Sequence, residues 1–179
     1  NTDLFGSNYV YNDFRKDPPL ERVGNHLRTA YRGLRMDYGN LFEEPETDEK
    51  FAIFPLHLQP EASTMLLAPM YLDQPSIVRQ IARSLPLNYK LYVKEHPNMV
   101  GRRPLSYYER FSDLSNVKLI HSDVDSHKLV KQSDIVTTIT GTMGLEALFY
   151  QTPVLTLGDP HYSRMEMVFE GGDPDAFDD

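Results

Sequence analysis

The fold is decided by residues 135–157, which read IVTTITGTMGLEALFYQTPVLTL. The β-branched run at 135–139 predicts a buried strand, residues 143–150 are typical of a helix, and residues 153–157 predict a second strand. Two strands that are joined through a helix lie parallel in one sheet, because a parallel pair needs a crossover connection. This unit therefore predicts an α/β fold.

The same alternation of strand and helix extends back toward residue 51. Apolar runs predict strands at 51–54, 91–93 and 117–120. Amphipathic stretches predict helices at 77–85, 106–111 and 126–132. We therefore expect a doubly wound, Rossmann-like parallel sheet of about five strands with helices on both faces, because right-handed crossovers distribute the helices in this way. A strand order of 3-2-1-4-5 would bring the loops after the first and fourth strands together.

Other residues flank the predicted sheet on both sides. We expect residues 1–50 to form an N-terminal helical and connecting segment with an acidic linker, residues 51–165 to form the Rossmann-like domain, and residues 166–179 to be an acidic tail. The first residue is Asn1 rather than Met, which indicates a processed chain or a piece of a longer protein.

A helix is predicted at 21–38 by apolar residues at helical spacing. On another of its faces lies a basic stripe of Arg28, Arg32 and Arg35. Such a stripe is typical of a solvated helix face, and contact with anionic lipid or with a neighbouring domain is the alternative.

Composition excludes several classes of function. The 179 residues carry 18 Lys and Arg against 26 Asp and Glu, and a net charge of −8 argues against broad nucleic-acid binding. The absence of cysteine excludes a thiolate zinc site and a cysteine nucleophile. No metal or cofactor is implied, and every apolar run is far shorter than the ~18 residues of a membrane span.

Candidate ligand-binding residues follow the strands directly, at the edge where doubly wound sheets bind ligands. His57 follows the first strand, His96 and Pro97 follow the second, and Thr140–Thr142 follows the fourth. His96 can donate a hydrogen bond to a phosphate oxygen, held in place by the turn at Pro97.

The glycines near the start of the last predicted helix favour phosphate binding. Gly141 and Gly144 leave room where backbone N–H groups emerge at the positive end of the helix dipole, although helix capping alone would explain one of the threonines. Glu146 projects from the same helical face as Thr142, either to accept bonds from ribose hydroxyls or only as an acid favoured by the dipole.

Several familiar signatures are missing from the sequence. No Gly-x-Gly-x-x-Gly follows the first strand, and no Walker-type phosphate loop or Gly-x-Ser-x-Gly elbow occurs. These absences argue against a dinucleotide oxidoreductase, a phosphate-loop ATPase and an α/β-hydrolase.

Taken in order, four motifs resemble the capsule polysaccharide biosynthesis family, which includes bacterial Kdo transferases and is related to two-domain GT-B glycosyltransferases. They are FPLHLQPEAST at 54–64, KEHP at 94–97, TGTMGLEAL at 140–148 and TPVLTLG at 152–158. The resemblance covers about residues 51–160 and implies the C-terminal, nucleotide-binding half of a glycosyltransferase that builds capsular or surface polysaccharide. By the same resemblance, the His-Pro pair and the Ser/Thr-rich helix start hold the phosphate and ribose of the donor.

The resemblance also implies partners. These are a CMP- or UDP-activated sugar donor, a glycan or glycolipid acceptor, and a second, N-terminal Rossmann-like domain that the motifs do not include. A cytoplasmic protein, with peripheral contact at the inner face of the cell membrane, is implied. His57 and Glu61 are the local candidates for catalysis, with a loop-shaping role equally open for Glu61.

Three other functions stay open at this point. A UDP-GlcNAc 2-epimerase and a polyol-phosphate transferase have a similar nucleotide-binding half. A non-catalytic nucleotide-binding module is the third alternative, since it would not require a second domain.

Overall fold

The computed structural model describes residues 19–38, 41–58 and 71–171. Its centre is a six-stranded sheet in the order β3-β2-β1-β4-β5-β6, in which every neighbouring pair is parallel. The strands are β1 (Lys50–Pro55), β2 (Tyr89–Lys94), β3 (Val117–Ile120), β4 (Ile135–Thr138), β5 (Val154–Thr156) and β6 (Val168–Glu170). The doubly wound fold is as predicted, and the first five strands have the order 3-2-1-4-5 on which the expected meeting of the loops depends.

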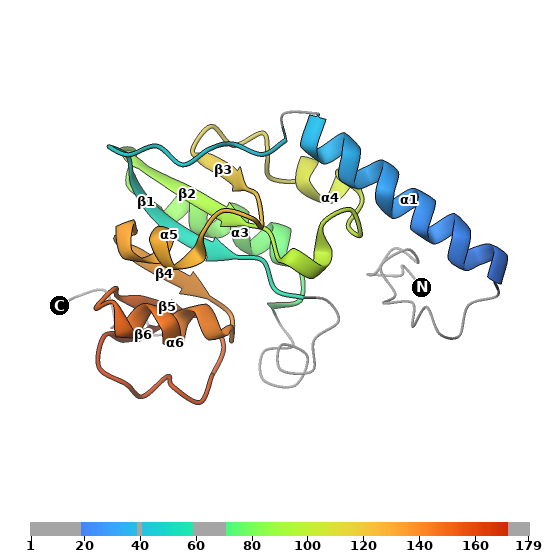
Figure 1. Cartoon of the computed structure of the whole chain (residues 1–179). Helices are drawn as coiled ribbons and strands as arrows, with labels where there is room; N and C mark the ends of the chain where they lie inside the picture. The colour runs from blue at the N-terminus through green and yellow to red at the C-terminus, as the bar shows by residue number, and fades with distance from the viewer. Residues whose placement is uncertain (1–18, 39–40, 59–70, 172–179) are drawn as a thin grey trace, which may run out of the picture.

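Helices cover both faces of this sheet (Figure 1). The helical elements are α1 (Pro19–Tyr38), α3 (Gln74–Ser84), η2 (Pro97–Met99), α4 (Leu105–Glu109), α5 (Ser126–Gln132) and α6 (Thr142–Phe149). Helices α3 and α4 bury their apolar side chains against one face, and α5 and α6 bury theirs against the other. Strand β1 supplies Ala52 and Phe54 to the first core and Phe51 and Ile53 to the second, so every residue of its apolar run is buried.

The sixth strand was not predicted from the sequence. Strand β6 lies within the stretch expected to be an acidic tail, and it pairs with β5 through Val154 opposite Val168 and Thr156 opposite Glu170. Phe169 keeps 46% of its surface exposed. A three-residue edge strand with so little burial has no apolar alternation that a sequence pattern could detect.

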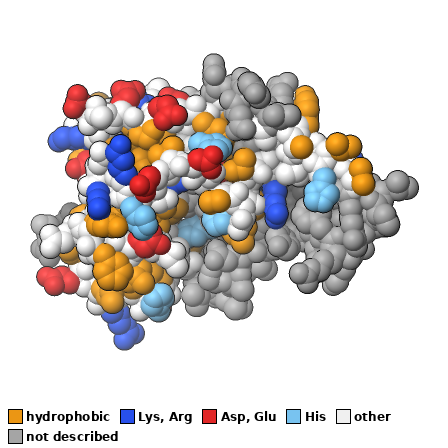
Figure 2. Space-filling model, in the orientation of Figure 1, with side chains coloured by type: hydrophobic (Ala, Val, Ile, Leu, Met, Phe, Trp, Pro, Cys, Tyr) orange, Lys and Arg blue, Asp and Glu red, His pale blue; other side chains and the backbone are white. Residues whose placement is uncertain are grey.

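Helix α1 lies outside the two helical layers and has its apolar stripe exposed. Val23, Leu27 and Tyr31 keep 58%, 66% and 61% of their surface exposed, and Figure 2 shows hydrophobic side chains at the surface along this helix. Of the predicted basic stripe, Arg28 is exposed, Arg32 donates to the carbonyl of Arg102 at 3.2 Å, and the side chain of Arg35 lies outside the described residues. Within the described part of the chain, no helix combines the length and apolar character that crossing a membrane requires.

The backbone of helix α1 lies very close to Gly101, a residue that follows η2 and has φ +71°. A Cβ on Gly101 would lie 2.4 Å from the carbonyl oxygen of Thr29, so only glycine permits this approach.

The acidic segment before β1 lies against the edge strand β3. The N–H of Glu43 donates to the carbonyl of Leu119 at 2.8 Å. Lys118 Nζ forms ion pairs with Glu46 at 2.6 Å and Glu49 at 2.8 Å. These contacts cover part of an edge that would otherwise expose its hydrogen-bonding groups.

Candidate functional site

The candidate site lies at the carboxyl edge of the sheet, where the strand order reverses between β1 and β4. Strand β1 pairs with β2 on one side and β4 on the other, so the loops that follow these three strands meet at one edge. A Cβ on Gly141 would lie 2.8 Å from Cε1 of His57. The loops after β1 and β4 are therefore in contact, as the strand order predicts.

His57 is buried against the end of β4, with 5% of its surface exposed. Its Nε2 accepts the N–H of Ile139 at 3.1 Å and lies 3.2 Å from the hydroxyl of Thr138. The neutral ring therefore carries its proton on Nδ1. Burial, together with the nearby charges of Arg103 and His96, lowers the pKa of His57 to about 4, so the ring is neutral at pH 7.

His96 is partly exposed and opens the short helix η2. Its Nδ1 accepts the N–H of Asn98 at 3.1 Å, which caps the helix and leaves the ring proton on Nε2 in the neutral form. Pro97 occupies the first position of η2 and is itself exposed. The loop thus holds the imidazole just beyond the carboxyl end of β2.

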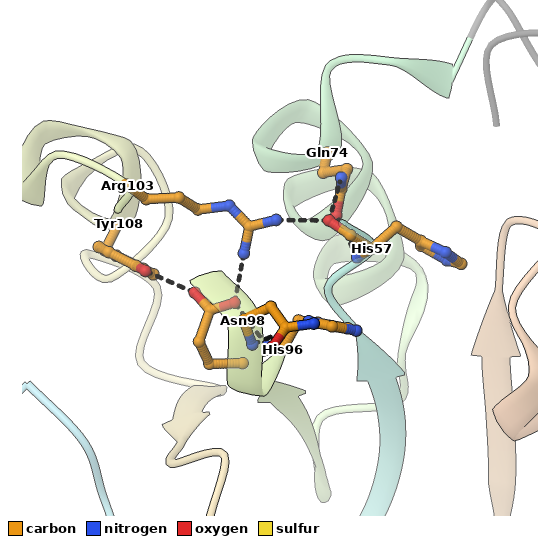
Figure 3. A network of polar contacts seen from close by, with 7 residues as sticks. His57, Gln74, His96, Asn98, Arg103 and Tyr108 are labelled. Carbon is orange, nitrogen blue, oxygen red and sulfur yellow. Dashed lines mark hydrogen bonds and ion pairs between the residues drawn. The ribbon is translucent and has the colours of Figure 1, made fainter. Parts of the chain in front are cut away.

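A buried polar network that the sequence analysis did not single out joins the loops after β1 and β2 (Figure 3). The guanidinium of Arg103 forms an ion pair with Glu95, and both side chains are fully buried. The second Nη of Arg103 donates to the carbonyl of His57 at 2.5 Å. The hydroxyl of Tyr108 donates to the other carboxylate oxygen of Glu95, and burial with this carboxylate nearby raises the pKa of Tyr108.

The backbone of His57 is held from the other side by Gln74, which is fully buried at the start of α3 (Figure 3). The Gln74 side chain accepts the N–H of His57 at 2.8 Å and donates to its carbonyl at 3.1 Å. The one sequence signal for this network was Glu95, a carboxylate that follows directly on a buried strand.

The start of α6 differs in detail from the expectation. Gly141 is the N-cap, and no side chain caps this helix, so the interpretation of one threonine as a cap is wrong. The N–H of Gly141 donates to the hydroxyl of Thr138 at 3.1 Å. By contrast Asp125, the N-cap of α5, accepts the N–H groups of His127 and Lys128 at 2.9 and 3.3 Å. Helix α6 therefore begins without the anionic cap that α5 has.

Gly144 has a packing role that the sequence did not reveal. A Cβ there would lie 2.5 Å from the hydroxyl of Tyr162, and the Gly144 N–H bonds to the carbonyl of Gly141 at 3.3 Å. The hydroxyl of Tyr162 donates to the same carbonyl, and burial raises its pKa to about 12. A side chain at position 144 would therefore block the approach of Tyr162, and the Gly144 N–H is already bonded within the helix start.

The other predicted residues differ in their surroundings. Thr142 is exposed at the first turn of α6, and Glu146 is partly buried on the same helix. The Thr140 hydroxyl is buried and has no hydrogen-bond partner among the described residues. Glu61 lies outside the described residues.

Comparison with known proteins assigns this arrangement to a family. The family model "Capsule polysaccharide biosynthesis protein" matches residues 44–171, which hold all six strands. The chain belongs to this capsule polysaccharide biosynthesis family. The resemblance carried by the four sequence motifs is thereby confirmed.

Two curated relatives and one solved structure show how much of a longer protein the chain spans. Protein FixF of Sinorhizobium fredii is 26% identical over 129 residues, which are 69% of this chain and 30% of that protein. Capsule polysaccharide modification protein LipA of Neisseria meningitidis serogroup B is 30% identical over 73 residues, 41% of this chain and 10% of LipA. A structure of the β-Kdo 2,4 transferase of KpsC from Thermosulfurimonas dismutans is 19% identical with a TM-score of 0.58, and the match covers 87% of this chain and 50% of that one.

The chain spans half or less of the length of each of these relatives. It has a Rossmann-like α/β fold, which it shares with the KpsC β-Kdo 2,4 transferase structure.

Proposed function

We propose that this chain is the donor-binding half of a glycosyltransferase of capsular or surface polysaccharide synthesis, and that its ligand is a CMP- or UDP-activated sugar. The observation that carries the proposal is the start of α6 at the switch point between β1 and β4, which has no side-chain cap and no acid in its first turn. Such a helix start attracts anions, because its N–H groups and dipole present positive charge. Membership of the family favours a nucleotide phosphate as that anion.

His96 is the second contact to the phosphate in this proposal. Its Nδ1 is engaged by Asn98, which directs the ring proton to Nε2 and makes the opposite side of the imidazole the donor. Thr140, Gly141 and Thr142 would hold the phosphate from the α6 side, and Glu146 would accept bonds from the ribose hydroxyls. When the glycosidic bond to the acceptor forms, the bond from the sugar to the nucleotide phosphate breaks, and the donors of His96 and α6 stabilise the negative charge that grows on the leaving phosphate.

Within the proposal, His57 positions the site instead of exchanging protons. Its Nε2 already accepts the Ile139 N–H, and a pKa of about 4 keeps the ring neutral. The group that activates the acceptor would then come from elsewhere, with Glu61 as the remaining local candidate. A second Rossmann-like domain, which would bring the glycan or glycolipid acceptor, and contact with the inner face of the membrane belong to the same proposal.

Isothermal titration of the chain with CMP, UDP, ADP and NAD tests the proposed ligand. We expect CMP or UDP to bind more tightly than ADP, and NAD to bind least. Tightest binding by NAD, or no binding by CMP and UDP, would overturn the assignment of the site.

A further inference from the structure

We propose that Glu95 and Arg103 are positioning residues that set the geometry of both candidate ligand loops, those after β1 and β2, together with the start of α6. Only the identity of the ligand in this inference rests on the proposed function. The coupling between the loops rests on hydrogen bonds within the chain.

The first step is that the guanidinium of Arg103 donates hydrogen bonds to residues that follow two neighbouring strands. Arg103, from the loop between η2 and α4, donates through one Nη to the Glu95 carboxylate and through the other to the carbonyl of His57. Glu95 follows β2 and His57 follows β1, and these two strands are paired side by side. The fork of an arginine fixes both acceptors relative to each other, which a lysine ammonium does not do.

The second step is that Glu95 also fixes the backbone next to it. Its carboxylate accepts the N–H of His96 at 2.6 Å, as well as the Tyr108 hydroxyl. The position of His96, which is the proposed phosphate contact, therefore depends on where Arg103 and Tyr108 hold the Glu95 carboxylate.

The third step carries the coupling to β4. Arg103 and Gln74 together hold the backbone of His57, and the His57 ring accepts the N–H of Ile139. The ring also contacts the Thr138 hydroxyl, which accepts the N–H of Gly141. A continuous series of hydrogen bonds thus runs from the loop after β2, across the end of β1, to the N-cap of α6.

Stability alone gives no reason for this pair. Replacing a buried ion pair by apolar residues of similar volume is often neutral or stabilising, because the desolvation of two charges offsets their attraction. The Glu95–Arg103 pair has fully buried side chains and lies at the ligand edge, where fixing the backbone of the loops determines how a ligand is held.

Two single variants and one matched control test the coupling without a ligand. Glu95→Gln and Arg103→Lys each weaken the ion pair, whereas Arg79→Lys alters a surface pair with Asp113 at 2.7 Å. In a ¹⁵N–¹H correlation spectrum, we expect both buried variants to move the amide signals of Ile139 and Gly141, and the control to leave them in place. Unmoved Ile139 and Gly141 signals in both buried variants would overturn the proposal.

The second measurement is the affinity for CMP. We expect Glu95→Gln and Arg103→Lys to weaken binding about tenfold, as is typical for residues that orient a ligand-binding side chain, while Arg79→Lys binds as the unchanged chain does. If the unchanged chain binds neither CMP nor UDP, the proposed function fails, and the amide signals still decide the coupling.

A triple variant separates positioning from packing. Glu95→Leu with Arg103→Met and Tyr108→Phe replaces the network by apolar side chains and leaves no side-chain polar group of the network stranded. We expect it to unfold near the temperature of the unchanged chain but to bind CMP at least about tenfold more weakly. CMP affinity equal to that of the unchanged chain would show that the pair only fills space, and would overturn the proposal. Should this variant fail to fold, the amide signals of the single variants decide.

Discussion

The loops after β1 and β2 occupy equivalent places at the edge of the sheet and each carries a histidine, but the two rings differ in burial and in the backbone N–H that they accept. His57 is buried, accepts a backbone N–H from β4 and has its pKa lowered to about 4. His96 is partly exposed, and its Nδ1 accepts the N–H of Asn98 at the start of η2, so the neutral ring carries its proton on Nε2. Each neutral ring thus accepts through one nitrogen and carries its proton on the other, but His57 does so inside the protein and His96 at the partly exposed edge.

This difference shows that position after a strand does not by itself define a ligand contact. The buried ring of His57 joins its own loop to the end of β4, whereas the partly exposed ring of His96 joins only residues of its own loop through Nδ1.

Replacing His57 should have the largest effect, and it should fall on stability. His57→Ala removes a buried ring and leaves the Ile139 N–H without its acceptor, so we expect the free energy of unfolding in urea to fall by about 3 kcal/mol at pH 7. His57→Gln, whose Oε1 can accept the same N–H, should recover part of this loss. A loss below about 1 kcal/mol for His57→Ala would contradict the holding role.

Replacing His96 should affect ligand binding instead. His96→Ala should weaken CMP binding by about 1.5–3 kcal/mol, the value of a hydrogen bond to a charged group, while unfolding changes by about 1 kcal/mol or less through loss of the η2 cap. Titration calorimetry and urea unfolding of the same sample separate the two effects. His127→Ala, at the start of α5 on the same edge, is the control and should bind CMP normally.

The lowered pKa of His57 predicts a pH dependence of folding. Because the folded chain holds this ring neutral, its contribution is complete above the unfolded pKa of 6.5 and is lost as the pH falls from 6.5 toward 4. Between pH 7 and pH 5 we expect the free energy of unfolding to drop by about 2 kcal/mol from this group. His57→Gln should show a flatter profile over this range, and an equal slope in both proteins would contradict the account.

Replacing Thr142 should have the smallest effect. Its hydroxyl caps no helix and is exposed, so Thr142→Ala should leave the unfolding free energy nearly unchanged. If the hydroxyl donates to a phosphate, CMP binding should weaken by about 1 kcal/mol. Cytidine, which lacks the phosphate, should bind both proteins equally, and an equal loss for cytidine and CMP would place Thr142 away from the phosphate.

How far the sequence could predict the molecule depended on whether a feature is local. The bounds predicted for β3 and α5 coincide with the observed Val117–Ile120 and Ser126–Gln132, because apolar runs and helical spacing are local patterns. Strand β6 was missed because its edge position removes that pattern.

At the candidate site, too, the local features could be predicted from the sequence and the contacts between distant residues could not. The loops that carry His57, His96 and Gly141 could be placed at one edge, because the carboxyl ends of parallel strands share an edge and the observed strand order is the one on which that expectation depended. The ion pair of Glu95 with Arg103, and the approach of Tyr162 to Gly144, are tertiary contacts between distant positions that no local spacing encodes.

The central claim, that the loop of His96 and the start of α6 form one phosphate site, is tested most directly by following the ¹⁵N-labelled chain during titration with CMP. The account predicts that the amide signals of 96–98 and 141–143 move first and saturate together, while those of His127 and Lys128 at the capped start of α5 stay in place. Cytidine should produce smaller movements at the same positions. Movement of the α5 signals without those of α6, or no saturable movement at either loop, would contradict the account.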